Sequence, residues 1–193
     1  MLHWDYYMTL ESDLLACRRY VEFHESNMHV HSIEFVRLLL ATCSEVEVLA
    51  KALCGKLDPS TEHGNIEQYR KTLAEALSLS DFEVEELQTP TRFKPFLDWA
   101  EQNSLTWWRS YNFVKHDRAN HYQDATLKNC IRSLGGLYIL NLYQHRDAFE
   151  RAELRPGSKL FAPQITQIPL TAPLRFGYRL PNVEKFGPRD HIF

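Results

Sequence analysis

Apolar residues recur at spacings of three and four along most of the chain, which is the period of a helix with one buried face. This pattern predicts helices over residues 4–23, 33–53, 66–77 and 124–149. Ser32 directly precedes the second of these stretches, and its hydroxyl suits the N-cap position of a helix. The repeated spacing therefore indicates a largely helical protein.

Two stretches break this pattern. Residues 79–105 contain two prolines and predict irregular structure, with a short helix over 94–100. Beyond Arg155, repeated prolines rule out a helix, but the many apolar residues between them argue against a disordered tail. We expect a helical domain over residues 1–150 and an extended, proline-rich arm over residues 151–193. This arm, with or without a short hairpin, packs on its own bundle or on a second subunit.

Three glycines stand at informative positions of the predicted helices. Gly55 fits the left-handed stop that commonly follows a helix. Gly135 and Gly136 lie in the middle of the last predicted helix, where each costs roughly 1 kcal/mol of helix stability. Such a pair predicts that another backbone approaches the helix closely.

The composition is that of an ordinary soluble globular protein. The chain has 193 residues, 44% of them hydrophobic and 24% charged, which is enough for one domain with a full core. No long apolar run and no signal-peptide pattern is present, so we expect a cytoplasmic protein without a membrane span. P-loop, Gly-x-Gly-x-x-Gly and Gly-x-Ser-x-Gly motifs are absent, which argues against common NTPases, dinucleotide-binding enzymes and α/β-hydrolases.

Neither the cysteines nor the clustered histidines predict a metal site or a cofactor. The four cysteines are scattered without a Cys-x-x-Cys pair, which favours reduced, buried thiols over zinc ligands. His29 and His31 are two residues apart, a spacing that does not place both imidazoles on one helical face.

The net charge of −3 conceals an uneven distribution along the chain. Residues 1–100 hold 9 Lys and Arg against 17 Asp and Glu, a balance of −8, whereas residues 101–193 hold 13 against 8, a balance of +5. A basic second half could attract a polyanion such as a nucleic acid. Alternatively, the two halves neutralise each other in the fold.

Residues 107–118 contain the densest group of side chains that can bind a phosphate or transfer a proton. On a helix each residue advances about 100°, which places Arg109, Asn112 and His116 on one face. The opposite face carries the apolar side chains of Trp107, Tyr111 and Val114. A guanidinium is a permanently charged phosphate clamp, and an imidazole exchanges a proton near neutral pH. The exposed face of such a helix suits phosphodiester chemistry.

The same residues resemble the signature of the HEPN superfamily (higher eukaryotes and prokaryotes nucleotide-binding). That signature is an Arg followed four to six residues later by a His, here Arg109-x6-His116. The segment Tyr111-Asn112-x-x-Lys115-His116-x-Arg118 looks like its common Tyr-Asn-x-x-Lys-His form, and Ala-Thr-Leu-Lys-Asn at residues 125–129 is similar to family sequences. The resemblance covers residues 4–150. It implies an all-α, up-and-down bundle of four to five helices that forms a homodimer with the two motifs facing each other.

The resemblance also implies an activity. Many members of this superfamily are metal-independent endoribonucleases of toxin–antitoxin, phage-defence and RNA-processing systems, in which the RNA 2′-hydroxyl attacks the scissile phosphate. Such a protein needs no cofactor, acts on RNA, here single-stranded RNA, and can have an antitoxin or regulatory protein as a partner. One position departs from the family, because Ser110 follows the motif arginine where Asn, Asp or His is common. The alternative is a non-catalytic HEPN-like dimer that binds nucleotide, RNA or a partner protein.

On the catalytic reading, two residues perform the chemistry. His116 acts as general base or acid, and Arg109 holds the phosphate and stabilises the charge of the transition state. Asn112, one turn before His116, hydrogen-bonds the phosphate or fixes the imidazole. Each of these residues also has a plainer reading as a surface or helix-end side chain.

Further residues, Ser110 among them, are candidates for supporting or RNA-binding roles. Lys115 and Arg118 supply phosphate contacts, or are merely solvated charges on the helix surface. Trp108 stacks on RNA bases, whereas Trp107 belongs to the core because it lies on the apolar face. Glu45, on the second predicted helix, is a candidate to orient a motif side chain, with a solvated surface glutamate as the alternative.

Overall fold

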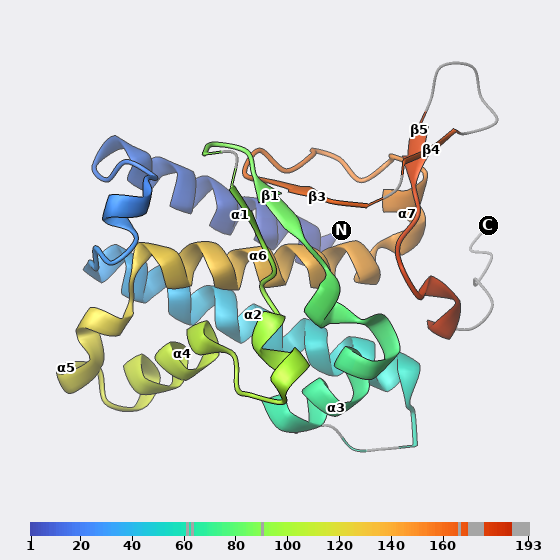
Figure 1. Cartoon of the computed structure of the whole chain (residues 1–193), viewed down its shortest axis with the longest axis horizontal. Helices are drawn as coiled ribbons and strands as arrows, with labels where there is room; N and C mark the ends of the chain where they lie inside the picture. Colours follow the sequence, from blue (N-terminus) through green and yellow to red (C-terminus); the bar gives the residue numbers. More distant parts are fainter. Residues whose placement is uncertain (61, 63, 90, 166, 170–175, 187–193) are drawn as a thin grey trace.

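The computed structural model describes residues 1–60, 62, 64–89, 91–165, 167–169 and 176–186. These residues contain seven α-helices (Figure 1). The helices are α1 (Leu2–Ala16), α2 (Ile33–Leu57), α3 (Ile66–Leu77), α4 (Thr106–His116), α5 (Arg118–His121), α6 (Leu127–Gln144) and α7 (Arg146–Glu150). None of the helices in the described part of the chain is long and apolar enough to cross a bilayer.

Helix α6 is the centre of the fold. It packs against α1, α2 and α4, and most of its residues are buried on every side. Figure 1 shows α6 running along the length of the molecule beside α2, with α1 close to it. A helix with most of its residues buried needs neighbours on most sides, and α1, α2 and α4 supply them for α6.

Side-chain caps fix where three helices begin. The Ser32 hydroxyl accepts a hydrogen bond from the Phe35 backbone N–H at 3.1 Å, which confirms the predicted start of α2. Asn65 caps α3 through Gln68 in the same way, at 3.1 Å, and Thr126 caps α6. Each such cap contributes about 1 kcal/mol. The prediction for α3 agrees with the structure at both ends.

Other predicted helix ends are wrong. The first helix ends at Ala16, because Cys17–Arg19 tighten into a 3-10 turn and residues 18–20 are exposed. The last predicted helix is broken at His145, which leaves helical backbone conformation and separates α6 from α7. Gly55 is not a left-handed stop, since α2 continues through it, and the chain instead leaves the helix at Asp58.

The protein is not strictly all-α, because it also contains a small antiparallel sheet. Strand β1 (Val84–Glu86) lies between β2 (Thr91–Phe93) and β3 (Phe161–Pro163). A second pair, β4 (Gln167–Pro169) with β5 (Phe176–Tyr178), forms a ladder within the arm. Strands of three residues are too short to show the alternation of buried and exposed positions that identifies a strand in a sequence.

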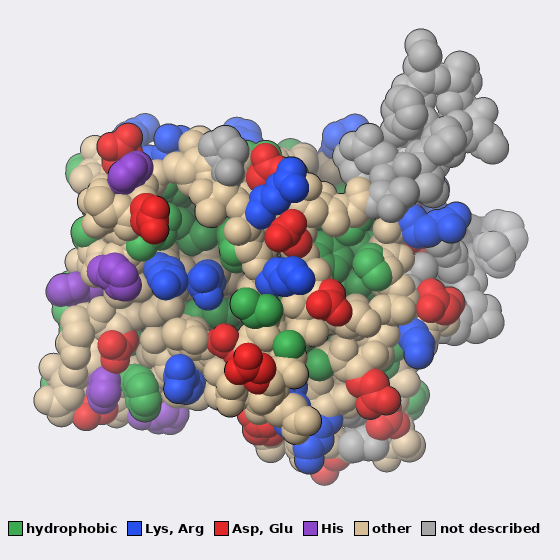
Figure 2. Space-filling view, viewed as in Figure 1, with side chains coloured by type: hydrophobic (Ala, Val, Ile, Leu, Met, Phe, Trp, Pro, Cys, Tyr) green, Lys and Arg blue, Asp and Glu red, His purple; other side chains and the backbone are tan. Residues whose placement is uncertain are grey.

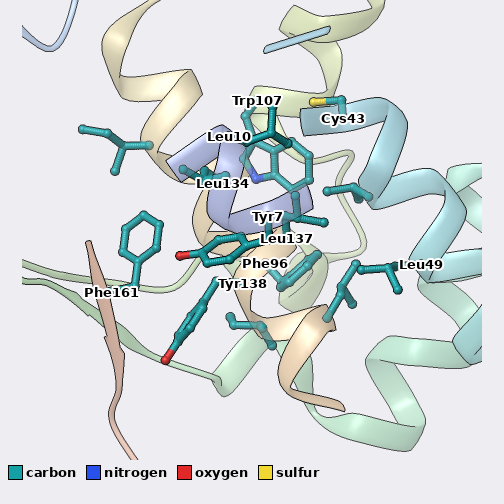
Figure 3. Packing of buried hydrophobic residues seen from close by; sticks show 14 of the residues in the cluster. Tyr7, Leu10, Cys43, Leu49, Phe96, Trp107, Leu134, Leu137, Tyr138 and Phe161 are labelled. Atoms are coloured by element: carbon teal, nitrogen blue, oxygen red, sulfur yellow. The ribbon is translucent and has the colours of Figure 1, made fainter. Parts of the chain in front are cut away.

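The described part of the arm packs on its own bundle. Strand β3 pairs with β1, and the Trp4 indole of α1 donates a hydrogen bond to the Pro156 carbonyl at 2.9 Å. Leu160 and Phe161 are fully buried in the same hydrophobic core as the helices. Figure 3 shows Phe161 beside Tyr138 of α6. Residues of the arm therefore complete the core rather than trail from it.

The two glycines inside α6 do mark a close approach, but by aromatic side chains instead of a backbone. A Cβ on Gly135 would lie 2.9 Å from Cζ of Phe93, and one on Gly136 would lie 3.2 Å from Cζ2 of Trp107. Figure 3 shows the Trp107 and Phe96 rings among the other core side chains. The glycines let these rings lie directly on the helix.

This packing predicts opposite effects of the same substitution at two helical glycines. Gly135→Ala should destabilise the fold by about 1–2 kcal/mol, because overpacking against Phe93 exceeds the gain in helix propensity. Gly55→Ala should stabilise it by roughly 0.5–1 kcal/mol, since nothing lies within 4 Å of the added methyl group. Urea unfolding of both variants measures the two changes, and equal signs would contradict the packing argument.

Candidate functional site

Helix α4 has the two faces that the sequence predicts. Its apolar side chains are buried against the bundle: Trp107, Trp108, Tyr111 and Val114. Arg109 and His116 are exposed on the other side, and Asn112 is half-buried. Asp98 fixes the start of the helix, because its carboxylate accepts hydrogen bonds from the Thr106 backbone N–H at 2.7 Å and from its hydroxyl at 2.9 Å.

The polar side chains of this face have no partners within the part of the chain that the structure describes. There, the side chains of Arg109, Asn112 and His116 have no hydrogen bond and no ion pair. Exposed cations on protein surfaces commonly pair with a nearby carboxylate, as Arg37 does with Asp13 and Glu34. The α4 face therefore leaves a guanidinium, an amide and an imidazole free for a ligand.

A second histidine lies beside this face, and it is not among the residues predicted from the sequence. The ring of His121, at the end of α5, stacks on Phe113 of α4 with centroids 4.6 Å apart. His121 Nδ1 lies 2.8 Å from a carboxylate oxygen of Asp124. Phe113 is one turn before His116, so the two imidazoles flank the same end of α4. A carboxylate on Nδ1 fixes the orientation of a histidine ring and leaves Nε2 for chemistry.

Two further cations border the α4 face. Lys115 Nζ lies 5.2 Å from the centre of the Tyr111 ring, and a hydrogen bond with the Tyr111 side chain raises the pKa of the lysine. Arg118, the first residue of α5, is exposed. Figure 2 shows histidine side chains gathered near the end of the molecule where Figure 1 places α5, with Lys or Arg side chains close to them. This end of the protein can attract an anion.

Ser110 ties α4 to α6 instead of joining the exposed face. The Asn129 side-chain amide donates a hydrogen bond to the Ser110 hydroxyl at 3.0 Å and another to the Asp124 carbonyl at 2.9 Å. Asn129 thus links α4 to the residue whose carboxylate orients His121. These hydrogen bonds help to hold Asp124, and through it His121, in place. Ser110 itself is not part of the exposed face of α4.

Like Ser110, two other predicted supporting residues do not reach the site. Trp108 is only 4% exposed and packs against Trp107 and Tyr111, so its ring has no free face for a base. Glu45 bonds His3 of α1 at 2.6 Å and therefore lies on a different side of α2. The α2 carboxylate whose charge acts on Lys115 is that of Glu47.

The cysteine side chains belong to the hydrophobic core. The thiols of all four cysteines are buried and free, and burial raises their pKa values. Within the described ranges, no three His, Cys, Asp or Glu side chains gather where they could hold a metal ion.

No family model, no curated protein and no solved structure matches this chain. The side chains of α4 and α5 and the chemistry that they can perform are therefore the evidence for a function.

Proposed function

We propose that this protein is a metal-independent endoribonuclease of the HEPN type that acts as a homodimer on single-stranded RNA. The observation that carries the proposal is the exposed face of α4. There Arg109, Asn112 and His116 lie together without partners among the described residues, next to the oriented imidazole of His121. A face built only for solubility would not need a histidine held by a carboxylate at its edge.

Cleavage proceeds by attack of the RNA 2′-hydroxyl on the adjacent phosphorus. His116 removes the proton of the 2′-hydroxyl, and the 2′-oxygen forms a bond to phosphorus. His121 donates a proton to the 5′-oxygen as the phosphorus–oxygen bond to it breaks. The products are a 2′,3′-cyclic phosphate and a free 5′-hydroxyl, with no water consumed in this step. Arg109 stabilises the charge that develops on the other phosphate oxygens.

The surroundings of α4 suit a single strand of RNA. Lys115 and Arg118 supply contacts to neighbouring phosphates, and Asn112 hydrogen-bonds the scissile one. Phe113 is 49% exposed and takes the base-stacking role for which Trp108 is too deeply buried. A second copy of the chain, with its α4 facing this one, would complete the walls of the cleft. A toxin or phage-defence effector, controlled by an antitoxin or another regulatory protein, is the cellular role that we propose.

A non-catalytic HEPN-like dimer that binds nucleotide, RNA or a partner protein is the second candidate. The position of Ser110 favours it, because this hydroxyl bonds Asn129 of α6 and adds no polar group to the exposed face. In that case the α4 face would hold a phosphate without cutting the strand.

Incubation with RNA and with DNA of the same sequence, both in EDTA, separates the two candidates. We expect RNA fragments ending in 2′,3′-cyclic phosphate and no cleavage of DNA, because DNA lacks the attacking hydroxyl. RNA binding by a dimer without cleavage of any RNA in a broad panel would establish the second candidate. Cleavage that stops in EDTA would overturn the metal-independent mechanism.

A further inference from the structure

A hollow in the surface is lined by no residue of α4. It has a volume of about 510 Å³, within the range of small-molecule sites. The start of α6 forms one wall, the loop around His24 and His29 a second, and the β1–β2 hairpin a third. Three segments far apart in the sequence thus meet around it, which is typical of a ligand pocket.

One wall of the hollow is cationic. Lys128 and Arg132 are four residues apart on α6, so their side chains lie on the same face of the helix and both line the hollow. Neither has an ion pair within the described part of the chain. In Figure 2, Lys or Arg side chains lie beside histidines over the region where α6 begins. Two adjacent cations with an imidazole nearby suit a phosphate group.

The acidic residues of the hollow do not cancel this charge at the α6 wall. Glu86 is buried, and its carboxylate accepts hydrogen bonds from the backbone N–H groups of Gln88 at 2.7 Å and Thr89 at 2.9 Å. The backbone of the hairpin turn therefore partly compensates the charge of this carboxylate. Glu25 is exposed and belongs to the loop on the other side of the hollow. There it can accept hydrogen bonds from the hydroxyl groups of a sugar.

The hollow also has an apolar surface beside its cations. The half-buried ring of Phe93 lines it together with Ile131. Phe161 holds this ring edge-on, with centroids 5.9 Å apart, and Gly135 lets the ring lie on α6. An aromatic ring fixed next to a cationic wall can take a planar base against its face.

We propose that this pocket binds a nucleotide, with the phosphate on Lys128 and Arg132 and the base against Phe93. The ligand is either a free nucleoside monophosphate or one nucleotide of an RNA strand, since both present the same groups. The proposal does not depend on cleavage at α4, because none of its residues belongs to the α4 face. A pocket lined by α6 and not by α4 could regulate the protein or hold a distant part of its substrate.

Calorimetric titration of the full chain with AMP tests the proposal. We expect AMP to bind, and Lys128→Ala/Arg132→Ala to weaken binding at least about tenfold through the loss of two charge-assisted hydrogen bonds. Lys51→Ala, which removes an exposed cation from α2, should leave AMP binding unchanged. Both altered residues of the double variant are only half-buried, so its melting temperature should stay near that of the wild type.

Further titrations identify the ligand. Adenosine and inorganic phosphate should each bind at least about tenfold more weakly than AMP, because each keeps only one of the two contacts. A tetranucleotide that binds more tightly than AMP, and is weakened by the same double variant, would identify RNA as the source. Equal affinities for AMP and the tetranucleotide would identify the free nucleotide as the ligand. No AMP or tetranucleotide binding, or AMP binding unchanged by the double variant, would overturn the proposal. AMP binding retained by His116→Ala would separate this site from the α4 face.

Discussion

His116→Ala should lower the rate of RNA cleavage about 10²–10⁴-fold, which is the usual contribution of a positioned proton-transfer group. The imidazole is exposed at the end of α4 and has no described partner, so its removal should leave the fold and RNA binding intact. The measurement is the single-turnover cleavage rate of one RNA in EDTA, at saturating protein. Melting temperature and dissociation constant are recorded for the same samples.

A histidine outside the site provides the matched control. His31 is exposed, and its ring packs edge-on against Tyr122. His31→Ala should therefore cleave RNA at nearly the wild-type rate. Equal rates for the wild type and His116→Ala would remove His116 from the mechanism.

The partnership of the two histidines can be tested by combining their substitutions. His121→Ala should also reduce cleavage strongly, because it removes the imidazole, oriented by Asp124, that donates a proton to the departing 5′-oxygen. Residues that act as one unit give strongly non-additive losses, so the double variant should be little slower than the slower single variant. Losses that multiply would mean that the histidines act in separate steps.

The sequence predicts the α4 face well because periodicity within a single helix determines it. Arg109 and His116 are seven residues apart, close to two helical turns, and Trp107 is buried on the opposite side as predicted. The same local signal locates α3 and the N-cap of α2. Features that depend on one helix or one cap are therefore accessible from a single sequence.

Features that depend on contacts between elements are not accessible from a single sequence. The stacking of Phe113 on His121 crosses the turn between α4 and α5, and no periodic pattern spans that turn. The β1–β3 ladder joins segments more than seventy residues apart in the chain. Glu45 faces α1 because of the rotation of α2 in the bundle, which the sequence of α2 alone does not determine.

The His121–Asp124 pair had a sequence signal that could have been used. The two residues are three apart, a spacing at which side chains on a helical turn meet. They also follow the Arg109–His116 motif directly. A second titratable group close in sequence to a candidate general base is the signal that points to them.

Glu11→Ala should destabilise the protein by about 3–5 kcal/mol, because several buried hydrogen bonds to the arm lose their acceptor at once. The carboxylate is 1% exposed and accepts hydrogen bonds from the Tyr7 hydroxyl at 2.8 Å and from the backbone N–H groups of Lys159 at 3.0 Å and Leu160 at 3.1 Å. It also bonds the Ser158 hydroxyl. Burial, and secondarily the charge of Glu11, raise the pKa of Tyr7, which keeps that phenol protonated as a donor.

The loss of stability in Glu11→Ala should be concentrated where the arm meets α1. Urea unfolding gives the free energy, and hydrogen exchange should show faster exchange at the amides of Lys159 and Leu160. Glu11→Gln keeps one acceptor oxygen, so it should lose less stability than the alanine variant. Asp5→Ala removes an exposed carboxylate from the same helix and should change stability by less than about 1 kcal/mol. A Glu11→Ala protein as stable as Asp5→Ala, with both amides still protected, would show that β3 pairing and apolar burial alone hold the arm on the bundle.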